Sequence, residues 1–157
     1  MKVISNLILA LVLITPGVTA YAHEKTGEYC SELKGFMTSV KPDETREITL
    51  RTFWGAREEG GQLVMGSKTC EHNDYDPGKK LCAYLIEHSS TEFAGANAKR
   101  ILNCLASKPA IGKHLDIHSG SFATTFGSQD RGVLVNLDLL PDKEPGEMVL
   151  RLQVLGY

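Results

Sequence analysis

The sequence predicts an α+β protein, a mostly antiparallel five-stranded sheet with about three helices packed on one face. Segments with apolar residues at helical spacing and segments in which apolar and polar residues alternate follow the order α-β-β-α-α-β-β-β. Turn-rich segments join the strands, which indicates hairpins rather than helical crossovers. Four cysteines in a chain with an apolar leader predict two disulfides.

Residues 1–22 have the three parts of a secretory signal peptide. Lys2 supplies a positive start, residues 7–14 form an uninterrupted apolar run, and residues 20–22 (Ala-Tyr-Ala) match a small-x-small cleavage site. The apolar run is shorter than the roughly 20 residues that a membrane-spanning helix needs. We therefore expect cleavage after this segment. The expected product is a single exported domain at residues 23–157, with no membrane span and a periplasmic or secreted location.

The charges of the expected mature chain point away from nucleic acids. Removing 22 residues from 157 leaves 135, which is the size of one domain, with 16 basic and 19 acidic residues. The basic residues form no stripe interleaved with aromatic ones, so we expect no nucleic-acid partner.

The first expected elements are a helix and a hairpin. Apolar residues at helical spacing predict a helix over residues 27–40, and Pro42 follows it. Apolar and polar residues then alternate from residue 47 to 52, which predicts a half-buried strand ending at Phe53 and Trp54. We expect a turn over residues 55–61 and a return strand over residues 62–70.

Two helices are expected next. Pro77 suits a first helical turn and predicts a short helix over residues 77–88. The segment from Ser89 to Glu92 matches a capping box, in which Ser89 caps the helix and Glu92 lies three residues later. It predicts a second helix that continues to about residue 106.

The last third of the chain is expected to be β. Leu115 and Ile117 alternate with polar neighbours and predict a strand over residues 114–118. Alternating apolar residues predict two further strands, over residues 133–139 and 148–154, and a turn-rich hairpin loop lies between them.

The cysteines are Cys30, Cys70, Cys82 and Cys104. An even number in an exported chain favours disulfides, and the absence of C-x-x-C pairs argues against zinc. Four cysteines allow three connectivities. Cys82 and Cys104 fall on consecutive predicted helices, offset by roughly 10 Å, which is too far for a bridge. We therefore favour Cys70–Cys82 and Cys30–Cys104.

The best candidate for metal chemistry is the pattern His114-x-Asp116-x-His118. If these residues lie on a strand, their side chains project from the same face. Two imidazoles and a carboxylate suit zinc or a similar divalent ion. The alternative is that they form the wet face of a strand whose Leu115 and Ile117 face the core.

Three further residues are candidates for binding a partner protein. Trp54 and Arg57 flank the turn of the first hairpin, and both residue types are enriched in interface hot spots. Tyr75 lies in an acidic loop between Cys70 and Cys82, where a disulfide would restrain it. The structural alternative is that Trp54 packs on the edge of the core and that Tyr75 is a half-buried loop residue.

The sequence contains no convincing catalytic set. No G-x-S-x-G elbow or phosphate-binding glycine loop occurs, and paired cysteines leave no free thiol as a nucleophile. We therefore expect a protein without catalytic activity or cofactor, which binds another exported protein as an inhibitor or immunity protein does. The alternative is a small metal-binding or metal-dependent protein built on His114, Asp116 and His118.

Overall fold

The computed structural model of the chain describes residues 20–106, 111–112 and 114–157. Most of the expected signal peptide lies outside these residues. The first described helix, α1 (Ala20–Ser39), begins before the expected cleavage point and seven residues before the predicted start at residue 27. Among the described helices, none is long and apolar enough to cross a membrane.

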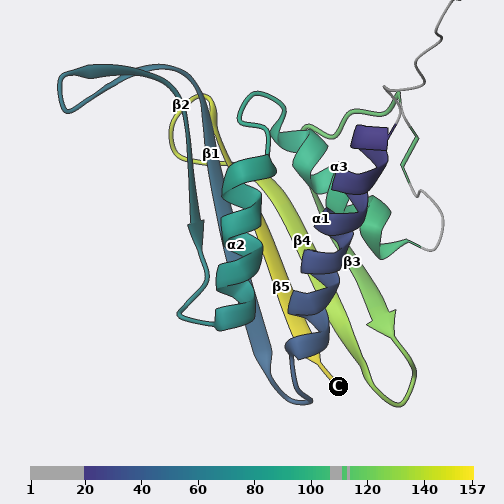
Figure 1. The fold of residues 1–157 in the computed structure, drawn as a ribbon. Helices are drawn as coiled ribbons and strands as arrows, with labels where there is room; N and C mark the ends of the chain where they lie inside the picture. The colour runs from purple at the N-terminus through teal and green to yellow at the C-terminus, as the bar shows by residue number, and fades with distance from the viewer. Residues whose placement is uncertain (1–19, 107–110, 113) are drawn as a thin grey trace, which may run out of the picture.

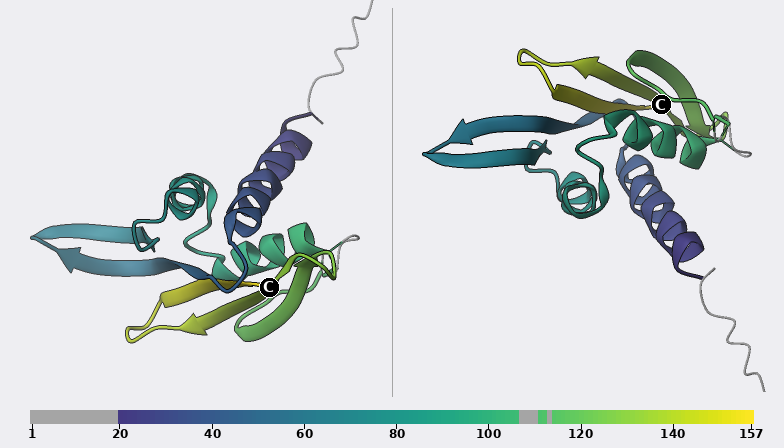
Figure 2. Two further views of the ribbon diagram at one scale, coloured as in Figure 1. Left: turned by 90° about the horizontal axis from the view of Figure 1, so that it is seen from below. Right: turned by 90° about the horizontal axis from the view of Figure 1, so that it is seen from above.

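Five strands form one antiparallel sheet in the order β2-β1-β5-β4-β3. The strands are β1 (Thr45–Glu59), β2 (Gln62–Glu71), β3 (Gly120–Gly127), β4 (Gly132–Pro141) and β5 (Glu147–Gly156). With α2 (Asp76–His88) and α3 (Ala94–Leu105), they follow the predicted order α-β-β-α-α-β-β-β. All three helices lie on one face of the sheet, and the other face is open (Figures 1 and 2). The predicted fold class is confirmed.

The core lies between the helices and the covered face of the sheet. Alternate residues of β1, β5 and β4 point into it, as the period of two in a strand requires. The helices contribute an apolar stripe from each of α1, α2 and α3. The largest fully buried side chains are Tyr29, Leu33, Phe36, Met37, Ile48, Leu50, Leu81, Leu85, Ile101, Leu137, Leu139 and Leu152.

Both predicted disulfides are confirmed. Cys30–Cys104 joins α1 to α3, with 5.2 Å between the Cα atoms, and closes a separation of 74 residues. Cys70–Cys82 joins β2 to α2, with 5.5 Å between the Cα atoms, and closes a separation of 12 residues. The first bridge therefore ties α1 to α3 and closes a long loop, and the second ties α2 to β2 and closes a short one.

The predicted start of α3 is wrong, because residues 89–92 form a loop and the helix begins at Ala94. The buried side chain of Asn97 holds this loop. Its Oδ1 accepts a hydrogen bond from the N–H of Ser90 (2.9 Å), and its Nδ2 donates one to the carbonyl of Ser90 (2.8 Å). Ser90 Oγ in turn accepts from the N–H of Phe93 (2.9 Å). Ser90 therefore organises the loop before α3, whose N-cap residue is Phe93.

The predicted strand at residues 114–118 is also wrong, since the strand lies at β3 instead. The carbonyl of Leu115 accepts a hydrogen bond from Lys99 Nζ (2.6 Å), and the carbonyl of Ile117 lies against Gly95 of α3. Contacts with α3 thus hold this segment in place of a ladder partner. In β3, Phe122 and Phe126 pack against the core and pair with Leu137 and Val133.

Candidate partner-binding surface

The first hairpin extends beyond the rest of the sheet. β5 pairs with β1 only from Thr45 to Phe53, whereas β1 and β2 remain paired to Glu59 and Gln62. Residues 54–66, here called the arm, therefore project from the body as a two-stranded ribbon (Figure 2). Six residues on one strand of the arm span roughly 20 Å at about 3.3 Å per residue.

The arm is longer than predicted because its turn is shorter. The expected turn over residues 55–61 shrinks to Gly60 and Gly61, whose φ angles of 58° and 82° suit a two-residue hairpin turn. The rest of the expected turn continues β1, with a shift in register between Trp54 and Arg57. Such a bulge bends and twists a strand, so it redirects the arm where it leaves the sheet.

The arm exposes large apolar side chains. Leu63 is 71 % exposed, Met65 54 % and Trp54 45 %. Five other large apolar side chains in the described part of the chain are exposed, and they are spread over α2, the loops, β4 and the C-terminus. Exposed apolar residues on a projection are typical of a binding surface.

Arg57 braces the arm against the turn between β4 and β5. Its guanidinium donates to Glu147 Oε1 (2.7 Å) and to Ser67 Oγ (2.9 Å), and it also contacts Glu59. The same group lies 4.1 Å from the ring centroid of Phe53. Arg57 makes all of these contacts within its own chain, which is the position of a residue that orients the arm.

The backbone adds a second brace at the base of the arm. The N–H of Trp54 donates to the carbonyl of Gly146 (3.0 Å). Gly146 has a φ of 86°, and a Cβ there would lie 2.3 Å from the carbonyl oxygen of Trp54. Only glycine fits both the conformation and the close approach. Arg51 adds a contact with Asp142 in the same turn.

Tyr75 lies at the opposite end of β1 from the arm. Its hydroxyl donates to Ser39 Oγ (2.8 Å), its ring meets Phe36 edge-on, and the Arg46 guanidinium lies 4.4 Å from the ring centroid. The structure therefore places Trp54 and Arg57 on the arm and leaves Tyr75 in a separate, half-buried place.

The residues of the predicted metal site lie in the irregular segment before β3. Asp116 and His118 line a cavity of about 710 Å³ beside the start of α3, whereas His114 is not among its lining residues. No group of three or more His, Cys, Asp or Glu side chains in the described residues is arranged to hold a metal ion. Because these residues do not form a strand, the reason for expecting a shared face is lost.

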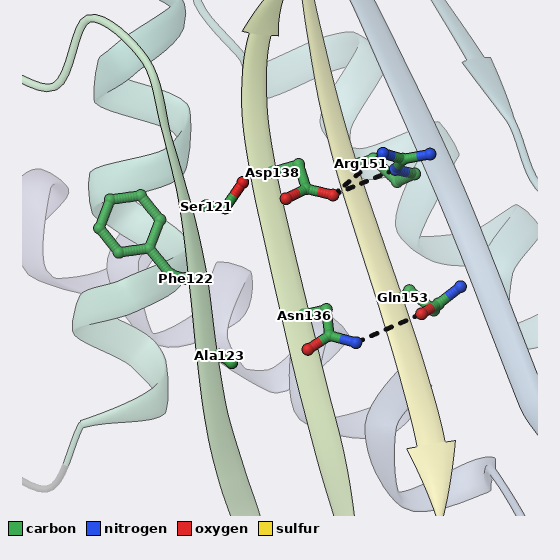
Figure 3. Close-up of a pocket in the computed structure, with 7 residues that line it drawn as sticks. All are labelled: Ser121, Phe122, Ala123, Asn136, Asp138, Arg151 and Gln153. Carbon is green, nitrogen blue, oxygen red and sulfur yellow. Dashed lines mark hydrogen bonds and ion pairs between the residues drawn. The ribbon is translucent and has the colours of Figure 1, made fainter.

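The open face of the sheet carries a shallow hollow of about 400 Å³ over β3, β4 and β5 (Figure 3). Its polar side chains pair with one another, since Arg151 contacts Asp138 (3.1 Å) and Asn136 Nδ2 donates to Gln153 Oε1 (3.3 Å). Gln153 Nε2 also donates to Glu47 Oε2 (3.3 Å). Paired groups of this kind make a solvated sheet surface.

Comparison with known proteins adds no assignment, because no protein-family model, curated protein or solved structure matches the chain. The functional interpretation therefore depends on the geometry of the arm. Sequence patterns identified Trp54 and Arg57 but missed Leu63 and Met65. The uninterrupted apolar run Leu63-Val64-Met65, close to the pair Gly60-Gly61, was the available signal.

Proposed function

We propose that this chain is an exported, non-enzymatic protein that binds another exported protein through its arm, as inhibitors and immunity proteins do. The observation that carries the proposal is the position of Trp54, Leu63 and Met65, which are exposed on a projecting hairpin. A stable fold gains nothing from exposing them, whereas a partner that covers them gains apolar contact area.

The braces support the proposal because they lower the entropic cost of binding. A free two-stranded ribbon would lose conformational freedom when a partner orders it. Arg57 and Gly146 fix the arm against the β4–β5 turn before any partner binds. Hot-spot residues are also most effective when they are held rigidly, and Trp is among the types enriched there.

The exported location is supported by two features. All four cysteines are paired in disulfides, which persist in oxidising compartments such as the periplasm and the extracellular space. The leader of the sequence has the pattern of a secretory signal. A partner in the same compartment follows from this location.

Affinity capture with matched variants tests the proposal. The baits are the mature protein, Leu63→Asp in the arm, and Leu115→Asp as a control of the same residue type, which is 62 % exposed away from the arm. We expect the unaltered protein and Leu115→Asp to retain one saturable protein from the same compartment, and Leu63→Asp to bind it at least about tenfold more weakly. Equal retention by all three baits, or no saturable partner, would contradict the proposal.

A further inference from the structure

β3 forms one edge of the sheet, and half of its backbone groups face away from β4. The N–H and the carbonyl of Gly132 both bond to Tyr157, directly after β5, at 3.3 and 3.0 Å. Gly132 therefore makes no such pair of bonds with Gly127, the residue opposite it on β3. Bonded and non-bonded pairs alternate along an antiparallel ladder. The residues of β3 whose backbone groups face outward are therefore Ser121, Ala123, Thr125 and Gly127.

This edge lacks the features that normally protect a free strand. Proteins block exposed edges with charged residues, prolines or bulges, and β3 (Gly-Ser-Phe-Ala-Thr-Thr-Phe-Gly) has none of these. The opposite edge strand, β2, carries the charged residues Lys68 and Glu71. Its pairing with β1 also contains a bulge, between Trp54 and Arg57. No backbone hydrogen bond from another described segment reaches the outer edge of β3. In the described part of the chain, β3 therefore presents its outward backbone groups where a further strand could pair with them.

The sequence of β3 fits a second copy of itself. In an antiparallel pair centred on Thr124, Thr124 faces its own copy and Phe122 faces Phe126 of the second copy, twice by symmetry. Ala123 faces Thr125 of the second copy on the open side of the sheet, where both side chains are small (Figure 3 shows Ala123). The four outward-facing residues then meet in bonded pairs, giving about eight hydrogen bonds.

The covered side of this edge has room for the aromatic pairs. Phe122 is half-buried and lines a cavity of about 480 Å³ between β3 and the end of α3. The described residues of α3 that line it are apolar, and they are Leu102 and Leu105. In the self-paired arrangement, Phe126 of the second copy lies beside Phe122 at the rim of this cavity. Directly opposed aromatic residues are among the favourable cross-strand pairs.

We propose that two copies of this chain pair antiparallel along β3, centred on Thr124, to form one continuous ten-stranded sheet. This inference is independent of the proposed function, because β3 and the arm lie at opposite edges of the sheet. The dimer would carry its two arms at its two far ends. Each arm could then bind a partner of its own.

Sedimentation of the mature protein tests the dimer. We expect a dimer at tens of micromolar, and we expect Ala123→Lys to raise the dimer dissociation constant at least tenfold, because it places a charge on each strand of the pair. Thr69→Lys, an exposed position on β2, is the matched control and should leave the dimer intact. A protein that remains monomeric up to millimolar concentration would overturn the proposal.

Disulfide trapping tests the register. Thr124 faces its copy in a non-bonded pair, where Cα atoms lie about 4.5 Å apart, so Thr124→Cys should form a covalent dimer on mild oxidation. Ala123→Cys is the control, since its copy lies about 7–8 Å away, beyond the usual reach of a bridge. Peptide mapping verifies that the native disulfides are retained. Equal trapping of both variants would overturn the register, and a Thr124→Cys protein trapped only to a different protein would show that another chain takes this edge.

Discussion

The two disulfides should stabilise the fold unequally, because they close loops of different length. A cross-link removes loop-closure entropy from the unfolded chain, and the effect grows with the logarithm of the number of residues enclosed. For separations of 74 and 12 residues, this relation gives about 4.4 kcal/mol for Cys30–Cys104 and about 2.8 kcal/mol for Cys70–Cys82. The expected difference in the free energy of unfolding is therefore about 1.6 kcal/mol.

The comparison is well matched, because packing losses are similar at the two bridges. Each bridge joins one buried cysteine, Cys104 or Cys82, to one half-buried cysteine. Urea unfolding of the double variants Cys30→Ala/Cys104→Ala and Cys70→Ala/Cys82→Ala measures the free energy of each, and the first should be the less stable. If the second variant loses as much stability as the first, loop-closure entropy does not govern these bridges.

Three further predictions concern single side chains. Burial raises the pKa of Tyr29. Above about pH 10 the unfolded chain therefore loses a proton that the folded chain keeps, and the free energy of unfolding should fall by up to about 1.4 kcal/mol per pH unit. Tyr29→Phe should remove this slope in denaturation curves measured from pH 9 to 11, and it should cost little at pH 7, because the hydroxyl has no hydrogen-bond partner among the described residues. Asn97→Ala should cost about 1–3 kcal/mol in urea unfolding, since it removes both hydrogen bonds of a buried side chain to the backbone of Ser90, and a cost near zero would contradict the assigned role. Arg57→Ala should speed amide hydrogen exchange across the arm while exchange in β4 stays unchanged, and unaltered exchange in the arm would show that Arg57 is no brace.

The elements with strong periodic patterns were predictable from the sequence. The apolar stripe on α1 and the alternation in β4 and β5 arise because each of these elements buries one face in the core. For the disulfides, helix geometry excluded Cys82–Cys104 and so one of the three connectivities, and the favoured one of the remaining two is the one observed. Pro77 marked the start of α2 within one residue.

The errors have a common physical cause, which is tertiary contact. The side chain of Asn97 bonds both backbone groups of Ser90, and local sequence patterns do not predict a contact with a side chain seven residues away. Lys99 and Gly95 of α3 contact the carbonyls of residues 114–118, where apolar and polar residues alternate. These contacts hold the segment in an irregular conformation in place of a strand. β3 is an edge strand with one half-exposed face, and its two phenylalanines give only a weak signal.

The candidate site was predictable only in part. Trp54 and Arg57 were singled out by residue type, and the structure places Trp54 at the base of the arm and Arg57 farther along it. The length of the arm depends on where β5 stops pairing with β1, which is set by the β4–β5 turn and is not encoded in the arm itself. Tyr75 was singled out by the same reasoning, but it contacts α1 and Arg46 at the other end of the strand.

Site-specific photo-crosslinking from the arm tests the central claim most directly. A photoreactive phenylalanine at Leu63 is compared with one at Lys143, which is exposed in the turn between β4 and β5. When each protein is irradiated in its native compartment, we expect the probe at position 63 to give one discrete adduct with another protein, and the probe at position 143 to give none. An identical set of adducts from both positions, or no adduct from position 63, would contradict the claim that the arm is the partner-binding surface.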